Sequence, residues 1–389
     1  MPPALGFQSY SYVNGFRKMF RISQSTVPIL IMFHKDNIVR HDSNTLPSAC
    51  SDFGRMYGGQ MTLRGETLTS EKKSRLRTFL ANHEYFLQKH KEEDAQVFSK
   101  IKQVTAEMIV SKPLSELTFR HAETDDDHQI LGFIEGRISS WDSEELGFKV
   151  AKLDHFYVRG ERSQSDLTRN HLLSEFINWS RNKEIDCILA RTSLGDHEAI
   201  AALEQFGFRT VNVLETFRRA CQVGKADAVV DSEAVDFLIE GCRENDVDKV
   251  ANLAGEIFRV DHFHNDVKIP VERSNRLHAS WARNCCQGRS DQVLVAKDHN
   301  SVAGFITCNV VEPFQGFRYG VIELVGVSPK HRGIGLGRRL LDDSLEWFTT
   351  HRTQSVYVGT EAENYPAMNL YINGSFRVTL SEVTMHWWA

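Results

Sequence analysis

Residues Val321–Arg339 read VIELVGVSPKHRGIGLGRR, and this stretch decides the fold. Its first part, Val321–Val327, is an apolar run that predicts a buried strand. After a turn at Pro329 come three glycines at alternate positions: Gly333, Gly335 and Gly337. The pattern then becomes helical, with apolar residues on one face: Leu336, Leu340, Leu341, Leu345 and Phe348. A strand, a glycine-rich turn and a helix N-terminus together direct backbone N–H groups at an anion, so we interpret this stretch as a pyrophosphate-binding turn.

The composition is that of an ordinary globular protein. The chain has 389 residues, of which 41% are hydrophobic and 25% charged, so we expect two or three domains. The net charge of −5 gives no support to a nucleic-acid partner. The seven cysteines are scattered without CxxC spacing, which favours reduced thiols over a zinc site or a disulfide framework. We therefore expect a cytoplasmic protein with no membrane span and no metal.

The chain divides into an extension and two halves. We expect residues 1–115 to be a partly helical N-terminal extension, to which no function can be assigned from its residues. Residues 116–221 and 235–389 each alternate predicted strands and helices. The small, weakly patterned residues 222–234 predict a linker between these halves. Near the start of the first half, Thr124 and three aspartates predict the N-cap of a helix over Ala122–Gly136.

One segment of each half suggests an internal duplication. Residues Ala199–Phe208 align without a gap on Ala367–Phe376, with alanine at the first place and phenylalanine at the last. Each segment is predicted as a helix between two strands. A duplication explains this order more economically than two unrelated short helices do.

Two of three known phosphate-binding patterns fail at the glycine-rich turn. A Walker loop needs Gly-Lys-Ser/Thr, but Gly337 is followed by two arginines. A dinucleotide-binding fold needs GxGxxG early in its domain, whereas this strand comes late and the glycines read GxGxG. The third pattern, R-G-x-G-x-G after a strand ending V-x-P, belongs to the GCN5-related N-acetyltransferases (GNAT). Val327–Gly337 resembles it at each defining place, and the alternative of a tight turn with incidental glycines leaves the spacing unexplained.

This resemblance implies an α+β fold with a mixed sheet and tandem GNAT-like domains. The second domain would be catalytic, and the first would be a degenerate copy, because its turn after Val158 lacks the glycines and Leu203 replaces a tyrosine. The donor implied is acetyl-CoA. The residues implied to bind it are Val325, Gly326, Val327, Arg332, Gly333, Ile334, Gly335, Leu336, Gly337, Arg338 and Asn364.

The resemblance also implies a catalytic centre. In the family the strand before the turn splays from its neighbour, and its free amides near Val325–Val327 would hold the thioester carbonyl and stabilise the oxyanion. Tyr371 stands where the family has a tyrosine that protonates the leaving thiolate. The usual glutamate five residues before Asn364 is absent, because that position is Gly359. Glu323 and His386 remain as alternatives for the base, as does a water chain.

Looser similarities link residues 117–389 to the tandem dTDP-fucosamine acetyltransferases. They include Trp141–Phe148, Gly207–Phe217 and Phe263–Asp266. This resemblance implies a nucleotide-linked amino deoxysugar as acceptor, bound by Arg259, His264 and Asp266. We keep two other functions open: acylation of a small amine, amino acid or protein amine, and acyl-CoA sensing without catalysis. A homodimer is compatible with either.

Overall fold

The computed structural model describes residues 69–125, 127–160, 162–221 and 237–389. The expected linker 222–234 and most of the expected N-terminal extension lie outside these residues. The described part of the extension contains two helices and a short 3-10 turn: α1 (Ser70–Asn82), η1 (Gln88–His90) and α2 (Ala95–Ser111). Thr69 and Asp94 cap the two helices by accepting backbone N–H groups, which is why the helices begin there.

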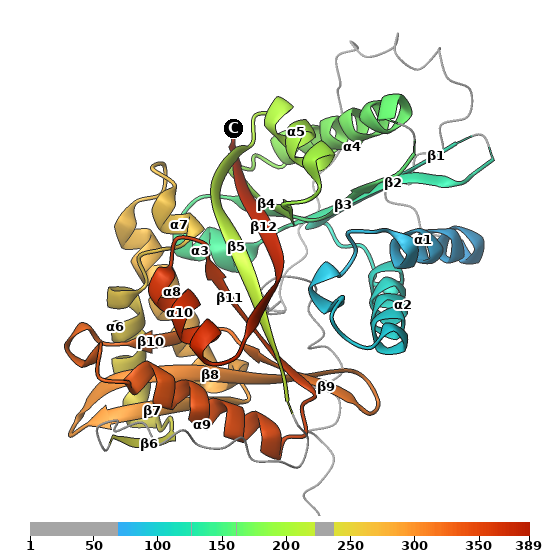
Figure 1. The fold of residues 1–389 in the computed structure, drawn as a ribbon. Helices are drawn as coiled ribbons and strands as arrows, with labels where there is room; N and C mark the ends of the chain where they lie inside the picture. Colours follow the sequence, from blue (N-terminus) through green and yellow to red (C-terminus); the bar gives the residue numbers. More distant parts are fainter. Residues whose placement is uncertain (1–68, 126, 161, 222–236) are drawn as a thin grey trace, which may run out of the picture.

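The two halves share a common order of three strands, a helix, a strand, a helix and a strand, to which each half adds further elements (Figure 1). The first half runs β1 (Thr118–Thr124), β2 (Ile130–Ile138), α3 (Ser140–Leu146), β3 (Val150–Val158), α4 (Arg162–Asn182), β4 (Cys187–Ser193), α5 (His197–Gln205) and β5 (Arg209–Ala220). The second half opens with β6 (Leu238–Gly241), α6 (Val247–Ile257), α7 (His262–Asn265) and α8 (Val271–Asn284). It continues with β7 (Gln292–Asp298), β8 (Ser301–Phe314), β9 (Phe317–Ile322), β10 (Val325–Val327), α9 (Leu336–Thr350), β11 (Ser355–Glu361), α10 (Tyr365–Asn373) and β12 (Arg377–Trp388).

The helix predicted over Ala122–Gly136 is wrong, because this segment is the β1–β2 hairpin. Asp125 and His128 belong to its turn: the Asp125 carboxylate accepts the Gln129 amide at 2.7 Å, and His128 has a left-handed φ of 60°. Asp and Asn favour such turns as much as helix caps, so the run alone did not distinguish the two. Gly136 lies under Phe176, where an added Cβ would come within 2.5 Å of the ring.

The strands of both halves form one mixed sheet, in the order β1-β2-β3-β4-β12-β5-β11-β9-β8-β7-β6, with β10 paired to β8. This α+β architecture confirms the predicted fold class. At the centre the two halves exchange their last strands. The C-terminal strand β12 pairs with β4 of the first half, and β5 of the first half pairs with β11 of the second. β5 and β12 also pair with each other, and they run side by side through the middle of Figure 1.

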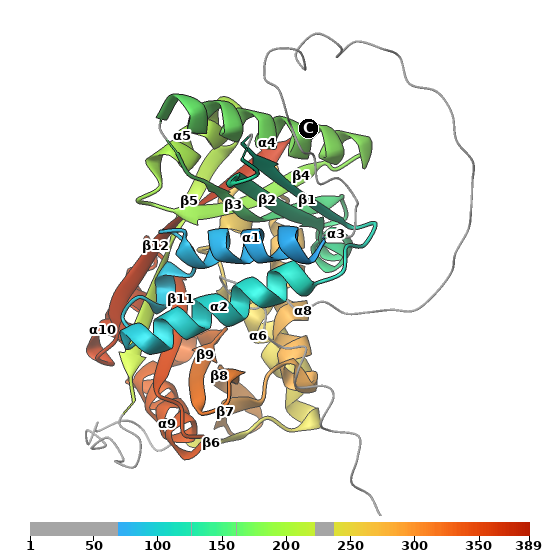
Figure 2. The same cartoon turned by 90° about the vertical axis from the view of Figure 1, so that its right-hand side faces the viewer.

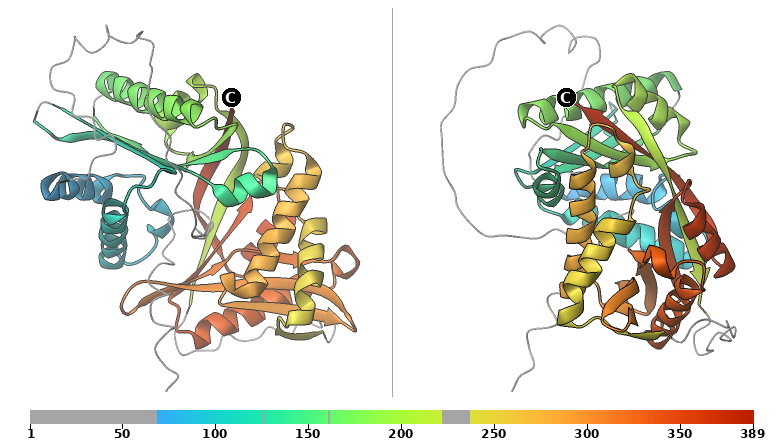
Figure 3. Two further views of the ribbon diagram at one scale, coloured as in Figure 1. Left: turned by 180° about the vertical axis from the view of Figure 1, so that it is seen from behind. Right: turned by 90° about the vertical axis from the view of Figure 1, so that its left-hand side faces the viewer.

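Helices cover both faces of each half-sheet. In the first half α4 and α5 pack on one face around Leu172, Phe176 and Leu203, and α1 and α2 pack on the other (Figure 2). In the second half α9 and α10 cover one face, while α6 and α8 cover the other (Figure 3). Helices α1 and α2 also contact the second half, through Phe317, Tyr319 and Tyr357.

Candidate active site

The glycine-rich turn forms the N-terminus of α9. Gly335 is its N-cap residue with a φ of 84°, and Gly333 has a φ of 77°. No side chain caps the helix, so the amides of its first turn keep their hydrogen-bonding capacity for another acceptor. Arg332, Gly333, Ile334 and Gly335 are exposed, while Leu336 is buried and anchors the turn. This open turn fits the anionic end of coenzyme A.

The side chains of His331 and Arg338 hold the turn and the start of α9 in place through polar contacts. His331 bonds the Ser328 hydroxyl at 2.6 Å through Nδ1 and the Asp298 carboxylate at 3.0 Å through Nε2. Arg338 bonds the Asp342 carboxylate and donates to the Asn373 carbonyl at 2.6 Å. Arg338 thus holds α9 to α10, and its guanidinium is largely engaged within the fold.

The strand before the turn separates from its parallel neighbour. β9 pairs with β11 from Tyr319 to Ile322, whereas β10 pairs on one side only, with β8. The break falls at Glu323 and Leu324, whose amides donate to the Thr307 hydroxyl at 3.2 and 2.9 Å. The amides of β10 that do not bond β8 therefore face the gap toward β11. The predicted splay is present at the predicted place.

Gly326 is required by the close packing of α6 against β10, and no bulge of the strand accounts for it. The irregularity of the strand lies before it, and its own backbone is regular and paired to Phe305. A Cβ at Gly326 would lie 2.3 Å from Cδ1 of Ile257 on α6. Packing of α6 against β10 therefore excludes a side chain here.

Tyr371 and Asn364 lie on α10, as the spacing predicts. Tyr371 is buried, and its ring lies 5.5 Å from Phe217 and 6.0 Å from Phe376. Burial raises the pKa of Tyr371 well above its ordinary value, so the hydroxyl keeps its proton. Asn364 is the N-cap: it accepts the Ala367 amide at 3.4 Å and donates to Thr360 at 3.0 Å. Asn364 thus positions α10, and hence Tyr371.

Glu323 is held in a buried ion pair. Its carboxylate accepts from the Arg289 guanidinium at 3.1 Å, the Trp281 indole at 3.0 Å and the Asn309 amide at 2.9 Å. The Glu323 side chain is 2% exposed. A carboxylate with three strong donors is a poor proton acceptor, so this environment does not favour the predicted role of general base.

The other predicted base, His386, is part of a chain of three polar side chains. Its Nδ1 donates to Asp266 at 2.7 Å, and its Nε2 lies 2.9 Å from Nδ1 of His262. Trp388 also donates to Asp266, at 2.8 Å. Burial alone would raise the pKa of Asp266. Hydrogen bonds from His386, the Lys268 backbone amide and Trp388 outweigh it and lower this pKa to about 2. These hydrogen bonds fasten the end of α7 to β12, so the Asp266 carboxylate is engaged in holding these two elements together.

The two remaining residues predicted to bind the acceptor are also engaged within the fold. Arg259 donates to the carbonyls of Gly255 and Phe258, both at 2.9 Å, and to the side chain of Asn275. His264 contacts Asp261 and lies 3.0 Å from Asn275. The segment Arg259–Asp266 is therefore an ordered, polar arm between α6 and α8.

Glu361, which the sequence did not single out, is the carboxylate best suited to accept a proton. It ends β11, three residues before Asn364, on the strand that separates from β10. Burial, together with the charge of the nearby Asp261, raises the pKa of Glu361 to about 7 against the opposing charge of Arg191. A pKa near 7 suits a general base at physiological pH. Counting back five residues from Asn364 overlooked Glu361.

In the first half, the corresponding gap between β3 and β4 is bridged by the N-terminal extension. His83 bonds the Val158 carbonyl at 3.2 Å, and the Tyr85 hydroxyl donates to the Gly195 carbonyl at 3.0 Å. A cavity of about 530 Å³ remains around these residues, Arg159 and Gly160. The bridge supports the interpretation of the first half as a copy without the catalytic parts.

Comparison with known proteins agrees with this geometry. The family model described as "Acetyltransferase (GNAT) family" matches residues 251–374, which include β10, the glycine-rich turn and α10. The match to this family thus covers most of the second half. The finer resemblance to the dTDP-fucosamine acetyltransferases has no such support.

Curated relatives match parts of the GNAT-containing chain. The spore coat polysaccharide biosynthesis protein SpsD of Bacillus subtilis is 25% identical over 146 residues, 37% of this chain and 48% of the relative. An L-methionine sulfoximine/L-methionine sulfone acetyltransferase of Salmonella typhimurium is 33% identical over 109 residues, 28% of this chain and 62% of the relative. The chain thus spans about half the length of the curated relatives it matches.

Solved structures share the whole two-halved GNAT fold. A GCN5-related N-acetyltransferase from Sphaerobacter thermophilus has a TM-score of 0.56 and 14% identity, covering 85% of this chain and 95% of that one. A tandem GNAT protein from the clavulanic acid biosynthesis pathway has a TM-score of 0.51 and 13% identity, covering 85% and 98%. At this identity the likeness establishes the fold alone.

Proposed function

We propose that the chain is an acyl-CoA-dependent N-acyltransferase that uses acetyl-CoA to acylate a primary amine. The observation that carries this proposal is that an uncapped glycine turn, a separated pair of strands and a buried tyrosine on the next helix border the same core. The turn would bind the pyrophosphate, and the β10 amides would bind the pantetheine arm and the thioester carbonyl. Bound acetyl-CoA supplies the activated acyl group.

The chain's own residues account for the proton movements. Glu361 would take a proton from the acceptor ammonium group, because an amine attacks only when it is neutral. The β10 amides would hold the negative charge that develops on the carbonyl oxygen. Tyr371 would give its proton to the departing sulfur, and its burial keeps that proton available. The second proton, which the attacking nitrogen loses once it has bonded the carbonyl carbon, would restore the tyrosine.

The preferred acceptor is a nucleotide-linked amino deoxysugar. The resemblance in Trp141–Phe148 and Phe263–Asp266 supports it, and one relative is named for polysaccharide biosynthesis. The second candidate is an amino acid, since relatives at 33% and 32% identity are named as acyltransferases of amino acids or their analogues. A homodimer and a cytoplasmic location stay predictions. Among the described residues, no helix has the length and apolarity needed to cross a membrane.

The test is acyl transfer by the purified full chain. Acetyl-CoA would be supplied with nucleotide amino sugars, free amino sugars and amino acids in parallel, while released thiol is measured and products are identified by mass. Acetylated amino sugar is the expected product. Turnover on amino acids alone would favour the second candidate. Acetyl-CoA binding without turnover on any acceptor would contradict the proposal and favour a sensor.

A further inference from the structure

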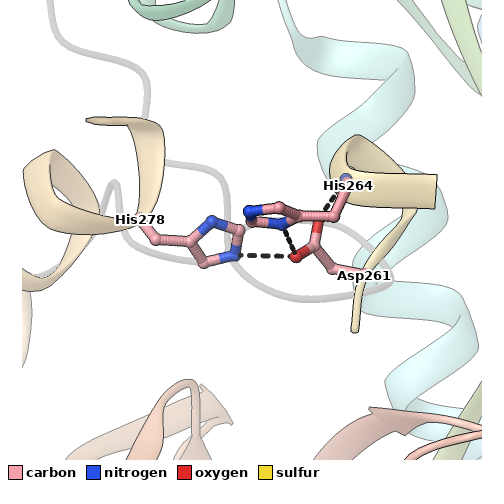
Figure 4. A group of neighbouring side chains, drawn as sticks. All are labelled: Asp261, His264 and His278. Carbon is pink, nitrogen blue, oxygen red and sulfur yellow. Dashed lines mark hydrogen bonds and ion pairs between the residues drawn. The ribbon is translucent and has the colours of Figure 1, made fainter. Parts of the chain in front are cut away.

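Three side chains that can bind a metal meet between α7 and α8. Asp261 is the N-cap of α7, His264 lies within α7, and His278 lies in the middle of α8. One ligand atom of each lies within 4.8 Å of the other two. All three side chains are nearly buried, with exposures of 10%, 5% and 5%. Figure 4 shows both imidazole rings directed at the same carboxylate.

The hydrogen bonds of the outer nitrogens fix which ring atoms carry protons. Nδ1 of His278 lies 2.9 Å from the Ser274 carbonyl, which only accepts, so this nitrogen carries a proton. Nε2 of His264 lies 3.0 Å from Oδ1 of Asn275. Arg259 donates to the same Oδ1, which identifies it as the amide oxygen, so Nε2 of His264 carries a proton too.

The inner atoms therefore converge as electron-pair donors. The Asp261 carboxylate turns one oxygen to the amides of Phe263 and His264, at 2.8 and 3.1 Å. Its other oxygen contacts Nδ1 of His264 and lies 3.6 Å from Nε2 of His278. A proton on His264 would satisfy one ring, yet the lone pair of His278 would still face a carboxylate oxygen. A cation bound by all three groups satisfies both rings at once.

We propose that Asp261, His264 and His278 bind one divalent transition-metal ion, of which Zn²⁺ is the best match. Two imidazoles and a carboxylate suit Zn²⁺ and its first-row neighbours, whereas Mg²⁺ and Ca²⁺ prefer oxygen ligands. Ser274 and Asn275 supply the outer hydrogen bonds that orient metal-bound histidines. The Phe258 ring stacks on His278, with 5.2 Å between the ring centroids, and so helps to fix the orientation of this imidazole.

Such an ion would hold α7 against α8 within the polar arm Arg259–Asp266. This arm lies close to Glu361, since the charge of Asp261 acts on the Glu361 carboxyl. The ion leaves a fourth coordination position for water or another ligand. The evidence for the proposal is the geometry of these three residues, and its test uses no activity measurement, so it can fail or succeed separately from the acyltransferase function.

The experiment is metal titration of the full chain after removal of bound metal by a chelator. Co²⁺ would report its ligands through visible d–d absorption, and Zn²⁺ would compete it away. We expect one equivalent bound, without a thiolate charge-transfer band. His278→Gln and Asp261→Asn, which retains an N-cap acceptor, should each weaken Zn²⁺ binding by about 100-fold, whereas the outer variant Asn275→Ala should weaken it by about 10-fold.

The control is His299→Gln. His299 also sits beside an aspartate, Asp298 at 2.8 Å, but its side chain is 96% exposed on a hairpin turn. Its replacement should leave the affinity unchanged. Excess Zn²⁺ should also raise the thermal unfolding midpoint of the unaltered chain, a readout that needs no variant to fold. The proposal fails if Zn²⁺ leaves that midpoint unchanged, if the His278 variant binds as tightly, or if a thiolate band places the metal at the cysteines.

Discussion

The ring of Phe217 lies 5.5 Å from the ring of Tyr371, tilted by 57°. Phe217 belongs to β5, the last strand of the first half, and Tyr371 belongs to α10 in the second half. The strand exchange brings them together, since β5 pairs with β11 beneath α10. The half that lacks the glycine-rich turn therefore forms one wall around the proposed general acid.

Removing the hydroxyl of Tyr371 should slow turnover without weakening donor binding. For Tyr371→Phe we expect kcat to fall by about 10²–10⁴, the usual contribution of a positioned proton donor. Acetyl-CoA affinity should stay within about twofold, because the ring keeps its packing. Steady-state kinetics and calorimetric titration would measure the two quantities.

Tyr319→Phe is the matched control for that change. Tyr319 is also a buried tyrosine with a raised pKa, but it packs against His90 of the extension. Turnover should be unchanged in this variant. Equal kcat in the unaltered chain and in Tyr371→Phe would remove Tyr371 from the mechanism.

The pH dependence should report Glu361. The raised pKa of about 7 means that Glu361 is protonated, and unable to act as a base, below neutral pH. In the chain freed of metal by a chelator, where Asp261 keeps its charge, activity should therefore rise with pH through about 7 and then level off. Glu361→Gln should lower kcat by about 10²-fold or more and remove this acidic limb from the profile.

Glu363→Gln provides the comparison. Glu363 is exposed, and its charge helps to raise the pKa of Glu361. This variant should keep its activity, with the acidic limb moved slightly to lower pH. A profile with an unchanged limb in Glu361→Gln would show that another group is the base.

Local spacing predicted the glycine-rich turn, Asn364 and Tyr371, because one helix and its preceding turn determine their relation. The exchange of β5 and β12 was not predictable in this way, since hydrophobic alternation shows that a strand is buried but not which strand it pairs with. The sequence did not predict Glu361 as a base for a related reason: its raised pKa comes from burial and from Asp261, which is distant in sequence.

The same limit applies to the metal-binding group and to the extension. His264 was singled out for another role, while Asp261 and His278 become its neighbours only when α7 packs on α8. The extension was predicted to be partly helical, but the place of α1 and α2 opposite α4 and α5 depends on contacts with β1 and β2.

The Arg289–Glu323 pair should be structural. Its side chains are 7% and 2% exposed, so Arg289→Met would leave a buried carboxylate without its cation. We expect a loss of about 3–5 kcal/mol in the free energy of unfolding. Urea unfolding would measure it, and the double variant Arg289→Met/Glu323→Leu should recover part of the loss.

The corresponding kinetic expectation concerns Glu323→Gln. This variant should retain most of its kcat, in contrast to Glu361→Gln, when both are assayed well below their unfolding temperatures. A fall in kcat as large as that of the Glu361 variant, in protein shown to be folded, would restore Glu323 as the base.

Two glycines allow the role of the turn in cofactor binding to be separated from backbone strain. Gly333 has a φ of 77° and Gly316 a φ of 90°, and an added Cβ would meet nothing within 4 Å at either place. Replacing either glycine by alanine should lower the free energy of unfolding by about 1–2 kcal/mol, because both residues have a left-handed backbone. Gly333 lies in the exposed turn before α9, whereas Gly316 lies in the β8–β9 hairpin. Only Gly333→Ala should therefore weaken acetyl-CoA binding, by about tenfold or more, since its Cβ and altered backbone disturb the amides that face the pyrophosphate. Equal affinities of the two variants in calorimetric titration would mean that the glycine-rich turn does not bind the cofactor.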